Sequence, residues 1–483
     1  MNTNRLARTI ARPGAVVVAT WAAVWLAWSV TRFALTPSGL AFAGIALPAL
    51  VLLVIAGLRS AFRAPTRAPV RPPVAPPAAA ERRAHGNSIA LLGASLCLPA
   101  GDTPNAVSAA ARRGTMPKLH STLVRSDASP VHACEVPSLS PADFPPASLD
   151  AEAIARLDIA HRRALLLSAN VLEKLFARSE KTGDPDAKAS PSASEKSPIT
   201  AELHLLLPKR WQDEASTLAA WLQAQFSHAS RSIHFTELHL HLLSTSQDAL
   251  GVMDSVNTAI NESNSRVQHV VLACDSRLAQ ADVSELERTG ALHGHGRPEG
   301  KIPAEGACAL LVASPGYDAG KPDGDGTPPP HLHRLLKTET PCEGQSDRSA
   351  TTSVEDNASL AALLDQAHNA SVPAGTRPNP CALVSDAGST SQPRLDLTSA
   401  AESAWPDQSA PVRLDHLGLA NGDSAALTLS TIAVAGALAV QTQRPALAIS
   451  VATGGSYAIV PVSFPVASAT SISESREMAK VAA

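Results

Sequence analysis

The chain has few aromatic residues and no dense cluster of positive charge. Phe, Trp and Tyr make up 3% of its 483 residues, and its formal net charge is −3. Domains that bind nucleic acids carry a basic surface, often with interleaved aromatic residues, so we expect no nucleic-acid partner. The GxxxxGK(S/T) phosphate loop and a strand-linked GxGxxG motif are also missing, which excludes the common nucleotide-binding motifs.

Cysteine is scarce, and its spacing shows no pattern. The six cysteines are scattered along the chain without a CxxC pair. This usage is typical of a reducing compartment and argues against a disulfide framework. Proline, by contrast, is frequent, with 38 residues, so we expect a sizeable part of the chain to be linker or loop.

Metal ligands are present only as His-x-His pairs, at His239/His241, His293/His295 and His331/His333. Two histidines that are two positions apart on a strand share a face, and imidazole is a common zinc ligand. Nothing in the sequence brings the three pairs into one place, and a polar strand face or a hydrogen-bonded loop histidine explains each pair. We therefore predict no metal site and no cofactor.

Two apolar runs near the N-terminus predict a transmembrane helical hairpin over residues 1–60. Residues 15–30 and 39–58 have about the length needed to cross a bilayer as helices. Arginine flanks the pair on both sides, at Arg5, Arg8, Arg12, Arg59, Arg63 and Arg67. The positive-inside rule then places both ends in the cytoplasm, at the bacterial inner membrane. The alternative, a cleaved signal peptide followed by a buried helix, lacks a small-x-small cleavage site before the second run.

Composition divides the remaining residues into linkers and one folded region. Residues 61–87 are rich in Pro, Ala and Arg and predict a semi-rigid linker. Residues 179–198 are charged and rich in Ser and Pro, which predicts a disordered insertion. Residues 467–483 predict a disordered tail. The folded region is therefore expected within residues 88–466.

Two stretches of this region share a pattern of one strand followed by a second strand that starts at glycine. In the first stretch, residues 267–273 form an apolar run, and residues 306–313 form the second. In the other stretch, residues 445–451 and 454–463 repeat the arrangement. Each pair follows a helix-rich segment, which predicts a duplicated α/β half-domain. We place the halves at about residues 88–314 and 331–466.

Several segments add a more specific pattern. Residues 274–276 read Cys-Asp-Ser, and residues 298–312 read PEGKIPAEGACALLV. Residues 88–101 read SIALLGASLCLPAG, and residues 414–426 read LDHLGLANGDSAA. Together these segments resemble the opening strand, the GxxPGEGA segment and the late GHxxGAA loop of the β-ketoacyl synthases. The resemblance implies the duplicated α-β-α-β-α layered domain of the thiolase-fold superfamily, here preceded by the membrane hairpin.

The resemblance also implies where chemistry would lie. Active relatives use a cysteine nucleophile at the N-terminus of a central helix, where the helix dipole lowers the pKa of the thiol and backbone amides form an oxyanion hole. Two histidines, or a histidine and an asparagine, complete that site. In this chain the nucleophile position and the two histidine positions are occupied, respectively, by Ser244, Thr245 and Ser246, by Ser385 and Asp386, and by Leu419 after Gly418. We therefore predict no catalytic residue, and His416 is either a displaced remnant or an ordinary loop histidine.

The cysteines themselves predict little reactivity. Cys97, Cys274, Cys308 and Cys381 lie beside or within apolar strands, where a small buried hydrophobic residue is expected. Cys274, before Asp275, is the first candidate if any thiol reacts. The remaining cysteines, Cys134 and Cys342, lie in loop-like segments without an adjacent base.

These observations predict a membrane-anchored, catalytically inactive ketosynthase-like protein that acts as a protein-binding adaptor or scaffold. For a catalytically degenerate family member, the resemblance implies a role as an adaptor in a bacterial envelope or secretion system, including type VI secretion, although no motif in this sequence specifies one. It also implies a homodimer. The alternative is a divergent enzyme that transfers acyl groups from acyl carrier or coenzyme A thioesters. A third hypothesis is a lipid-binding module that uses a vestigial acyl tunnel without chemistry.

Overall fold

The computed structural model describes one unit, which lies within Glu81–Ala483. The described residues are 88–137, 139, 155, 157–181, 199–229, 233–263, 267–315, 317, 328–338, 352–372, 380–406, 412–452 and 455–465. The predicted hairpin (1–60), linker (61–87) and tail (467–483) lie outside this set. Within the described part, no helix combines the length and the apolar composition that crossing a bilayer requires.

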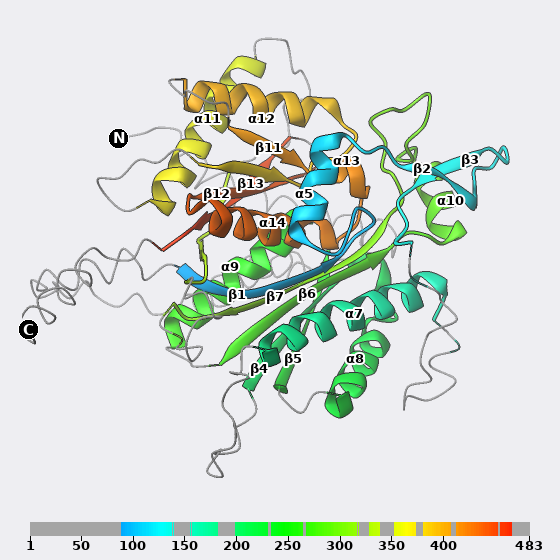
Figure 1. The fold of residues 1–483 in the computed structure, drawn as a ribbon. Coiled ribbons are helices and arrows are strands. Elements are labelled where there is room, and N and C mark those ends of the chain that lie inside the picture. The colour runs from blue at the N-terminus through cyan, green and yellow to red at the C-terminus, as the bar shows by residue number, and fades with distance from the viewer. Residues whose placement is uncertain are drawn as a thin grey trace, which may run out of the picture. The chain divides into compact units, whose positions relative to one another are not determined.

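Within the described residues, eleven strands form one mixed sheet with two equivalent halves (Figure 1). The N-terminal half contains β1 (Ser88–Cys97), β4 (Ile199–Pro208), β5 (Ile233–Leu243), β6 (Gln268–Ser276) and β7 (Glu305–Ala313). The C-terminal half contains β8 (His331–His333), β9 (Leu336–Lys337), β10 (Ala382–Ser385), β11 (Arg413–His416), β12 (Ala446–Val451) and β13 (Tyr457–Ser463).

The strand order shows the duplication directly. The N-terminal half runs β5-β4-β6-β7-β1, and the C-terminal half runs β11-β10-β12-β13-β8, with β9 paired to β13. In each half the first two pairings are parallel and the next two are antiparallel. Strands β1 and β8 pair antiparallel and join the halves. The predicted duplication is confirmed. The two strands that were predicted to start at glycine, β7 and β13, occupy equivalent positions in the two halves.

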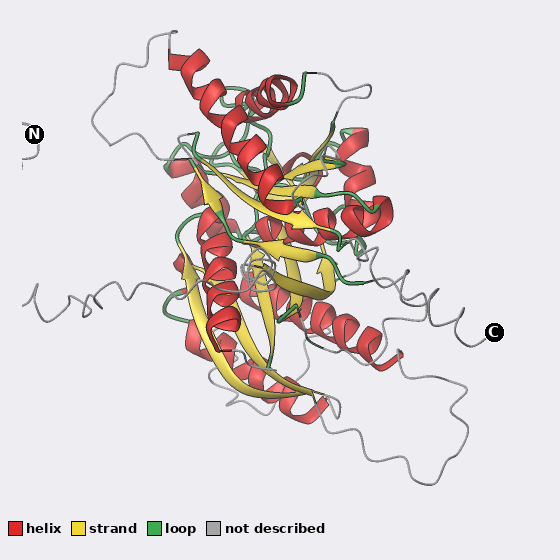
Figure 2. Cartoon of the chain, turned by 90° about the vertical axis from the view of Figure 1, so that its left-hand side faces the viewer, coloured by secondary structure: helices red, strands yellow, loops and turns green. Residues whose placement is uncertain are grey.

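Helices cover both halves and separate them, so the layers alternate between helix and sheet (Figures 1 and 2). The helices α7 (Ile159–Lys181) and α8 (Ala215–Ala229) cover the outer face of the N-terminal half. The central layer holds α9 (Ser246–Ser263) and α14 (Ala426–Thr442). The outer face of the C-terminal half carries α11 (Thr352–Ser371) and α12 (Ser391–Ala404). This is the predicted α-β-α-β-α arrangement.

Helix α14 is apolar on every side because it packs between the two halves. Its contacts include β7 on one side and β10 and β12 on the other. Small residues let the backbones approach closely: a Cβ atom at Gly436 would lie 2.7 Å from Cδ2 of Leu91. Burial of each large side chain such as Leu429 or Ile432 contributes about 1.5–3 kcal/mol. The helix is thus a shared core element of both halves.

Two boundaries differ from the sequence prediction. The apolar spacing predicts one helix over residues 150–177, but residues 157 and 158 are not helical and α7 begins at Ile159. The Asp158 side chain accepts a hydrogen bond from the backbone N–H of His161 (2.9 Å) and caps the helix there. The same helix continues to Lys181, so the first residues of the predicted insertion (179–198) are helical, and residues 182–198 lie outside the described set.

Several elements were not predicted. They are α5 (Pro104–Arg113), the hairpin of β2 (Lys118–Val124) and β3 (Pro130–Ala133), the helix α12, and the short strands β8, β9 and β11. For α5 the signal was present: Thr103 caps the helix by accepting from the N–H of Ala106 (3.2 Å), proline follows at the first turn, and Gly114 ends it in a left-handed conformation.

Candidate functional site

The junction between the two halves brings together two of the positions that the resemblance singled out. Ser246 starts α9 at the end of β5, and Asp386 follows β10 directly. Ser450, on β12, links them: its Oγ lies 3.2 Å from Oγ of Ser246 and donates a 2.7 Å hydrogen bond to Oδ2 of Asp386. We call Ser246, Ser450, Asp386 and Thr428 the junction network.

Asp386 is held by hydrogen-bond donors rather than by a cation. Thr428, on α14, donates to Oδ2 (2.8 Å), and the backbone N–H of Val451 donates to Oδ1 (2.8 Å). Burial raises the pKa of Asp386 to about 6, against the lowering effect of these hydrogen bonds, and the nearby charge of Asp423 raises it further. The carboxyl therefore changes its charge close to neutral pH, which makes it a candidate functional group.

The N-terminus of α9 is already occupied by an acidic cap. Oδ2 of Asp248 accepts hydrogen bonds from the backbone N–H groups of both Ser244 and Thr245, each 2.8 Å long. These two amides precede the first residue of α9, and the Asp248 carboxylate in the first turn places a negative charge close to any anion or oxyanion at this helix terminus. Ser244 and Thr245 are exposed, so of the three predicted residues only Ser246 points into the junction network.

The late loop offers a residue that sequence analysis missed. Leu419 lies on the short helix α13 (Gly418–Asn421), and not at the start of α14. Gly422 follows with φ of 67°, a left-handed conformation, and a Cβ there would lie 2.8 Å from Cβ of Ala304. Asp423 comes next, and its Oδ2 accepts a 2.9 Å hydrogen bond from the N–H of Ile302. Burial raises the pKa of Asp423. Because the charge of Asp423 also acts on Asp386, Gly422 positions a second acid near Asp386.

Ser385 and His416 form a separate pair. Oγ of Ser385 lies 2.7 Å from Nδ1 of His416, across the parallel pairing of β10 and β11. Burial lowers the pKa of His416 to about 4, with a further contribution from Arg394, so the imidazole is neutral. Ser385 is only 1% exposed, which is typical of a hydrogen bond within the core and unfavourable for attack on a substrate.

The described cysteines are buried or half-buried and poorly suited to react. Burial raises the pKa of Cys97 to about 11 and that of Cys134, Cys274 and Cys308 to about 12, and it also raises the pKa of Cys381. Cys274, the first candidate from the sequence, is 1% exposed. A thiol with such a pKa carries almost no thiolate at neutral pH. Cys342 lies outside the described residues.

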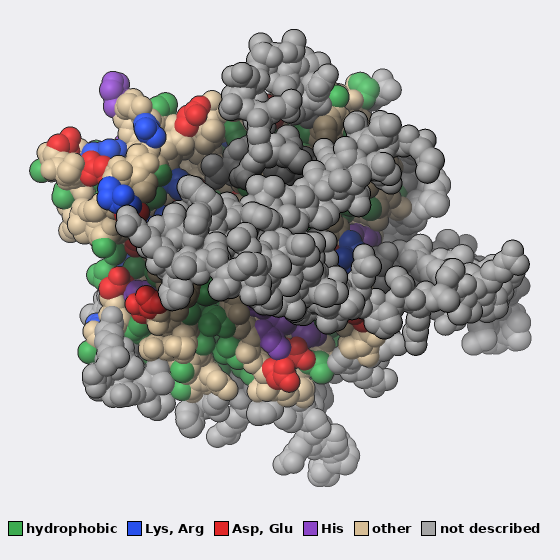
Figure 3. Space-filling view, turned by 180° about the vertical axis from the view of Figure 1, so that it is seen from behind, with side chains coloured by type: hydrophobic (Ala, Val, Ile, Leu, Met, Phe, Trp, Pro, Cys, Tyr) green, Lys and Arg blue, Asp and Glu red, His purple; other side chains and the backbone are tan. Residues whose placement is uncertain are grey.

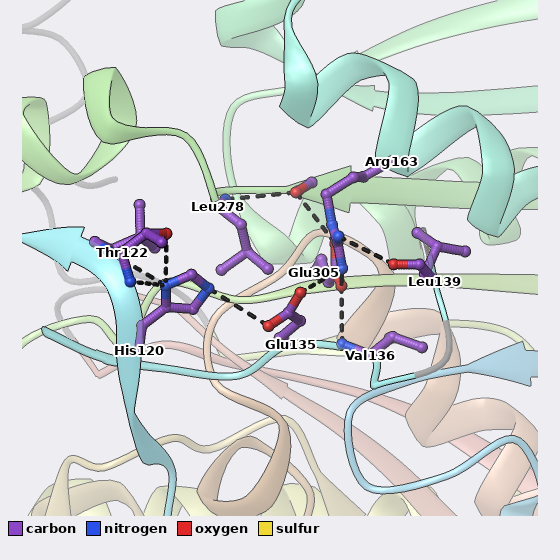
Figure 4. A network of polar contacts seen from close by, with 10 residues as sticks. His120, Thr122, Glu135, Val136, Leu139, Arg163, Leu278 and Glu305 are labelled. Atoms are coloured by element: carbon purple, nitrogen blue, oxygen red, sulfur yellow. Dashed lines mark hydrogen bonds and ion pairs between the residues drawn. The ribbon is translucent and has the colours of Figure 1, made fainter. Parts of the chain in front are cut away.

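A buried ion pair joins α7 to β7 within the N-terminal half. Arg163, on α7, donates from Nε to Oε2 of Glu305 (2.7 Å) and from Nη2 to Oε1 (2.5 Å), as Figure 4 shows. The N–H of Val136 also donates to Glu305 (2.8 Å), and Glu135 lies 3.0 Å from Arg163. Because the charges are paired and the contacts join three chain segments, this arrangement is structural.

The His-x-His pairs have different surroundings. His239 and His241 lie near His204 and His269 on neighbouring strands. The ring centroids of His293 and His132 lie 5.9 Å apart. His331 and His333 lie on β8. The structure thus gathers four histidines on β4, β5 and β6.

Comparisons with known proteins identify the fold. No protein-family model matches the chain, and no curated protein sequence matches it. Among solved structures, the ishigamide ketosynthase/chain length factor shares 16% identity at a TM-score of 0.50, covering 79% of this chain and 100% of that chain.

Two further structures agree. The ketosynthase from module 6 of the bacillaene synthase of Bacillus subtilis 168 gives a TM-score of 0.52 at 11% identity, over 79% of this chain and 72% of that one. AntDE:AntF, described as a type II PKS acyl-carrier protein in complex with its ketosynthase, gives 0.50 at 12% identity, over 78% and 100%. The described domain therefore has the same fold as these ketosynthases, as the resemblance predicted.

Proposed function

We propose that this protein is a ketosynthase-like adaptor that binds another protein and does not carry out cysteine-based condensation. The observation that carries the proposal is the junction network. At the places where the resemblance expects a thiol and an imidazole, it has the hydroxyl of Ser246 and the carboxyl of Asp386, joined through Ser450.

The electrostatics of the junction support this proposal. An imidazole N–H can donate a hydrogen bond to an oxygen that becomes negative during attack on a thioester, whereas an ionised carboxylate only accepts. Asp386 and Asp423 would instead repel that charge. The capped N-terminus of α9 offers no compensation at Ser244 and Thr245, because both amides donate to Asp248.

The partner is proposed to be a protein. One ketosynthase of similar fold was solved with an acyl-carrier protein bound, and a carrier-like protein is one candidate here. A second copy of this chain is another: β5 is an edge strand, and its Leu240 and Leu242 are 39% and 37% exposed. Pull-down from detergent-solubilised membranes would identify the partner and would test the predicted link to type VI secretion.

We also propose that residues 1–60 anchor the domain at the inner membrane, with the domain in the cytoplasm. The two apolar runs and their flanking arginines support this placement. Deletion of residues 1–60 should move the protein from the membrane fraction to the soluble fraction. Retention of the shortened protein in the membrane fraction would contradict the anchor.

Covalent labelling tests the absence of acyl transfer. The protein is incubated with acyl-coenzyme A and with an acyl carrier thioester, and its intact mass is measured. We expect no adduct in the unmodified protein. The variant Ser246→Cys, which places a thiol at the N-terminus of α9, serves as the reactive comparison. An adduct on any cysteine or on Ser246 of the unmodified protein would overturn the adaptor proposal.

The hydrogen-bond chain favours a second candidate, a serine-based acyl transferase. In this hypothesis Ser246 attacks a thioester carbonyl, and its proton passes through Ser450 to Asp386, whose pKa of about 6 suits a base at neutral pH. The acyl group becomes bonded to Oγ of Ser246, the C–S bond breaks, and the proton held by Asp386 passes to the departing thiolate. Transfer that is lost in Ser246→Ala and follows the titration of Asp386 would support this candidate over the adaptor.

A further inference from the structure

Five side chains on one face of the N-terminal half form what we call the histidine cluster: Glu202, His204, His239, His241 and His269. The parallel registers explain the gathering, because His204 lies opposite His239 on β5, and Glu202 lies opposite His269 on β6. Alternation along each strand then places all five on the face opposite to Leu203 and Leu205. The sequence spacing alone showed only the His239/His241 pair.

The ring nitrogens of the cluster lie very close to one another. Nδ1 of His204 is 3.3 Å from Nε2 of His241, and its Nε2 is 3.1 Å from Nδ1 of His269. Nε2 of His239 is 3.2 Å from Oε2 of Glu202. The ring of His204 stacks on that of His239 with 4.7 Å between centroids. Nδ1 of His269 also lies 3.5 Å from Oε2 of Glu202. Glu202, His239, His269 and Nε2 of His204 therefore lie in one small region, whereas His241 lies at the other ring nitrogen of His204.

The residue types suit metal binding. Imidazole nitrogen and carboxylate oxygen are both common zinc ligands. Glu202 adds the negative charge that a divalent cation prefers.

The distances match a tetrahedral ligand set. A zinc ion bound at 2.0–2.1 Å holds its ligand atoms about 3.3 Å apart, close to the separations in the cluster. Ligand atoms of Glu202, His204 and His239 all lie within 4.8 Å of one another. The side chains of His239 and Glu202 are 37% and 27% exposed, so an ion can reach the site from solvent. Figure 3 shows histidine side chains beside acidic ones on the rear face of the molecule.

We propose that Glu202, His204 and His239 bind a divalent transition-metal ion of the zinc class, with His269 as the fourth ligand. The competing explanation is a metal-free chain of neutral imidazoles, in which each contact holds one N–H donor and one acceptor. The ion would cross-link β4 with the edge strand β5. This site is independent of the junction network and of the proposed adaptor function.

Zinc titration of the full chain, purified without a histidine tag, tests the proposal. A chromophoric chelator competes for the ion, and the bound metal is also counted by elemental analysis. We expect one zinc ion per chain. His239→Gln and Glu202→Gln should each weaken binding by about tenfold or more, since even changes beyond the direct ligands cost 10–100-fold. His295→Gln, which changes an exposed histidine in a turn, should leave the affinity unchanged.

Cobalt substitution adds a readout of geometry. A tetrahedral nitrogen and oxygen ligand set gives visible absorption bands that differ from those of hydrated, octahedral cobalt. Because His239 and Glu202 are partly exposed, their glutamine variants should keep the fold, and circular dichroism checks this. Zinc binding that is absent, or that is equally strong in His239→Gln and in His295→Gln, would overturn the proposal and leave the hydrogen-bonded chain of imidazoles.

Discussion

Two acidic residues in the interior illustrate different solutions to burying a carboxyl group. Glu305 is fully buried and neutralised by Arg163. Asp386 forms no ion pair with any residue that the structure describes, and hydroxyl and amide donors hold its carboxyl instead. A buried charge that is paired and hydrogen-bonded supports the fold, whereas an acid with a raised pKa costs stability when it ionises. The contrast separates a structural acid from a candidate functional one.

The largest effect is expected when the paired acid loses its partner. Arg163→Met leaves the Glu305 carboxylate buried without a counter-charge, so we expect the free energy of unfolding to fall by about 3–5 kcal/mol. Urea unfolding followed by circular dichroism measures this. A loss below about 1 kcal/mol would mean that water or another group compensates Glu305, and the contrast with Asp386 would fail.

The unpaired acid should respond in the opposite direction. The carboxyl of Asp386 has a pKa of about 6 in the folded state against 3.8 ordinarily. The folded state therefore binds the proton more tightly, and stability falls as the pH rises from about 4 to 6. Above that range the loss is constant, at most about 3 kcal/mol. Asp386→Asn removes the cost of ionising this carboxyl, so the free energy of unfolding at pH 7.5 should rise by up to the same amount.

The same variant should show little gain at pH 4, where the carboxyl of Asp386 is protonated. Unfolding curves at the two pH values provide the measurement. Asp365→Asn, on the exposed side of α11, is the matched control and should change stability equally little at both. A destabilised Asp386→Asn at pH 7.5 would show that the ionised carboxylate supports the fold.

A smaller effect is expected from a single donor of the junction network. Ser450→Ala removes the 2.7 Å hydrogen bond to Asp386, which should cost about 1.5–3 kcal/mol where the carboxylate is ionised. The cost should be lower at pH 4. Ser403→Ala, on an exposed turn of α12, provides the reference. An equal cost at both pH values would indicate lost packing instead of a lost bond to a charge.

The smallest effect is expected for an ion pair at the surface. Arg288 and Glu285 make a 2.7 Å contact on α10 (Gln280–Arg288), with side chains 71% and 58% exposed. Water screens such pairs, so Arg288→Ala should unfold at the same urea concentration as the unmodified protein. A measurable loss would show that removal of any arginine destabilises the protein and would weaken the conclusion from Arg163→Met.

Much of the fold could be predicted from local pattern. The apolar runs predict β6, β7, β12 and β13 to within a few residues, because strands buried on both faces need continuous apolar sequence. Alternation predicts that Leu238 and His239 face opposite sides of β5, as the structure shows. The strand β11 is short and the helix α12 has a weak apolar pattern, so both were missed.

The site was predictable only where one residue stands next to a recognisable element. Asp386 directly follows β10, and Ser246 follows β5 after Ser244 and Thr245, so the ketosynthase resemblance could place both at strand ends. Ser450 and Thr428 lie 64 and 42 positions from Asp386, and hydroxyl residues in strands and helices carry no distinctive spacing. Either Gly418 or Gly422 could correspond to the glycine of the late loop. Only Gly422 has a positive φ, which favours Gly422 as that glycine and Asp423 as the residue after it.

The position of α14 also has a consequence during synthesis. The strands β1, β6 and β7 leave the ribosome long before α14, yet their inner side chains share one core cluster with that helix. Until about residue 442 has emerged, much of that apolar surface has no permanent cover, and such surface invites aggregation. Chaperone contact with the nascent chain should therefore concentrate on the inner face of the first half and end when the second half closes over it.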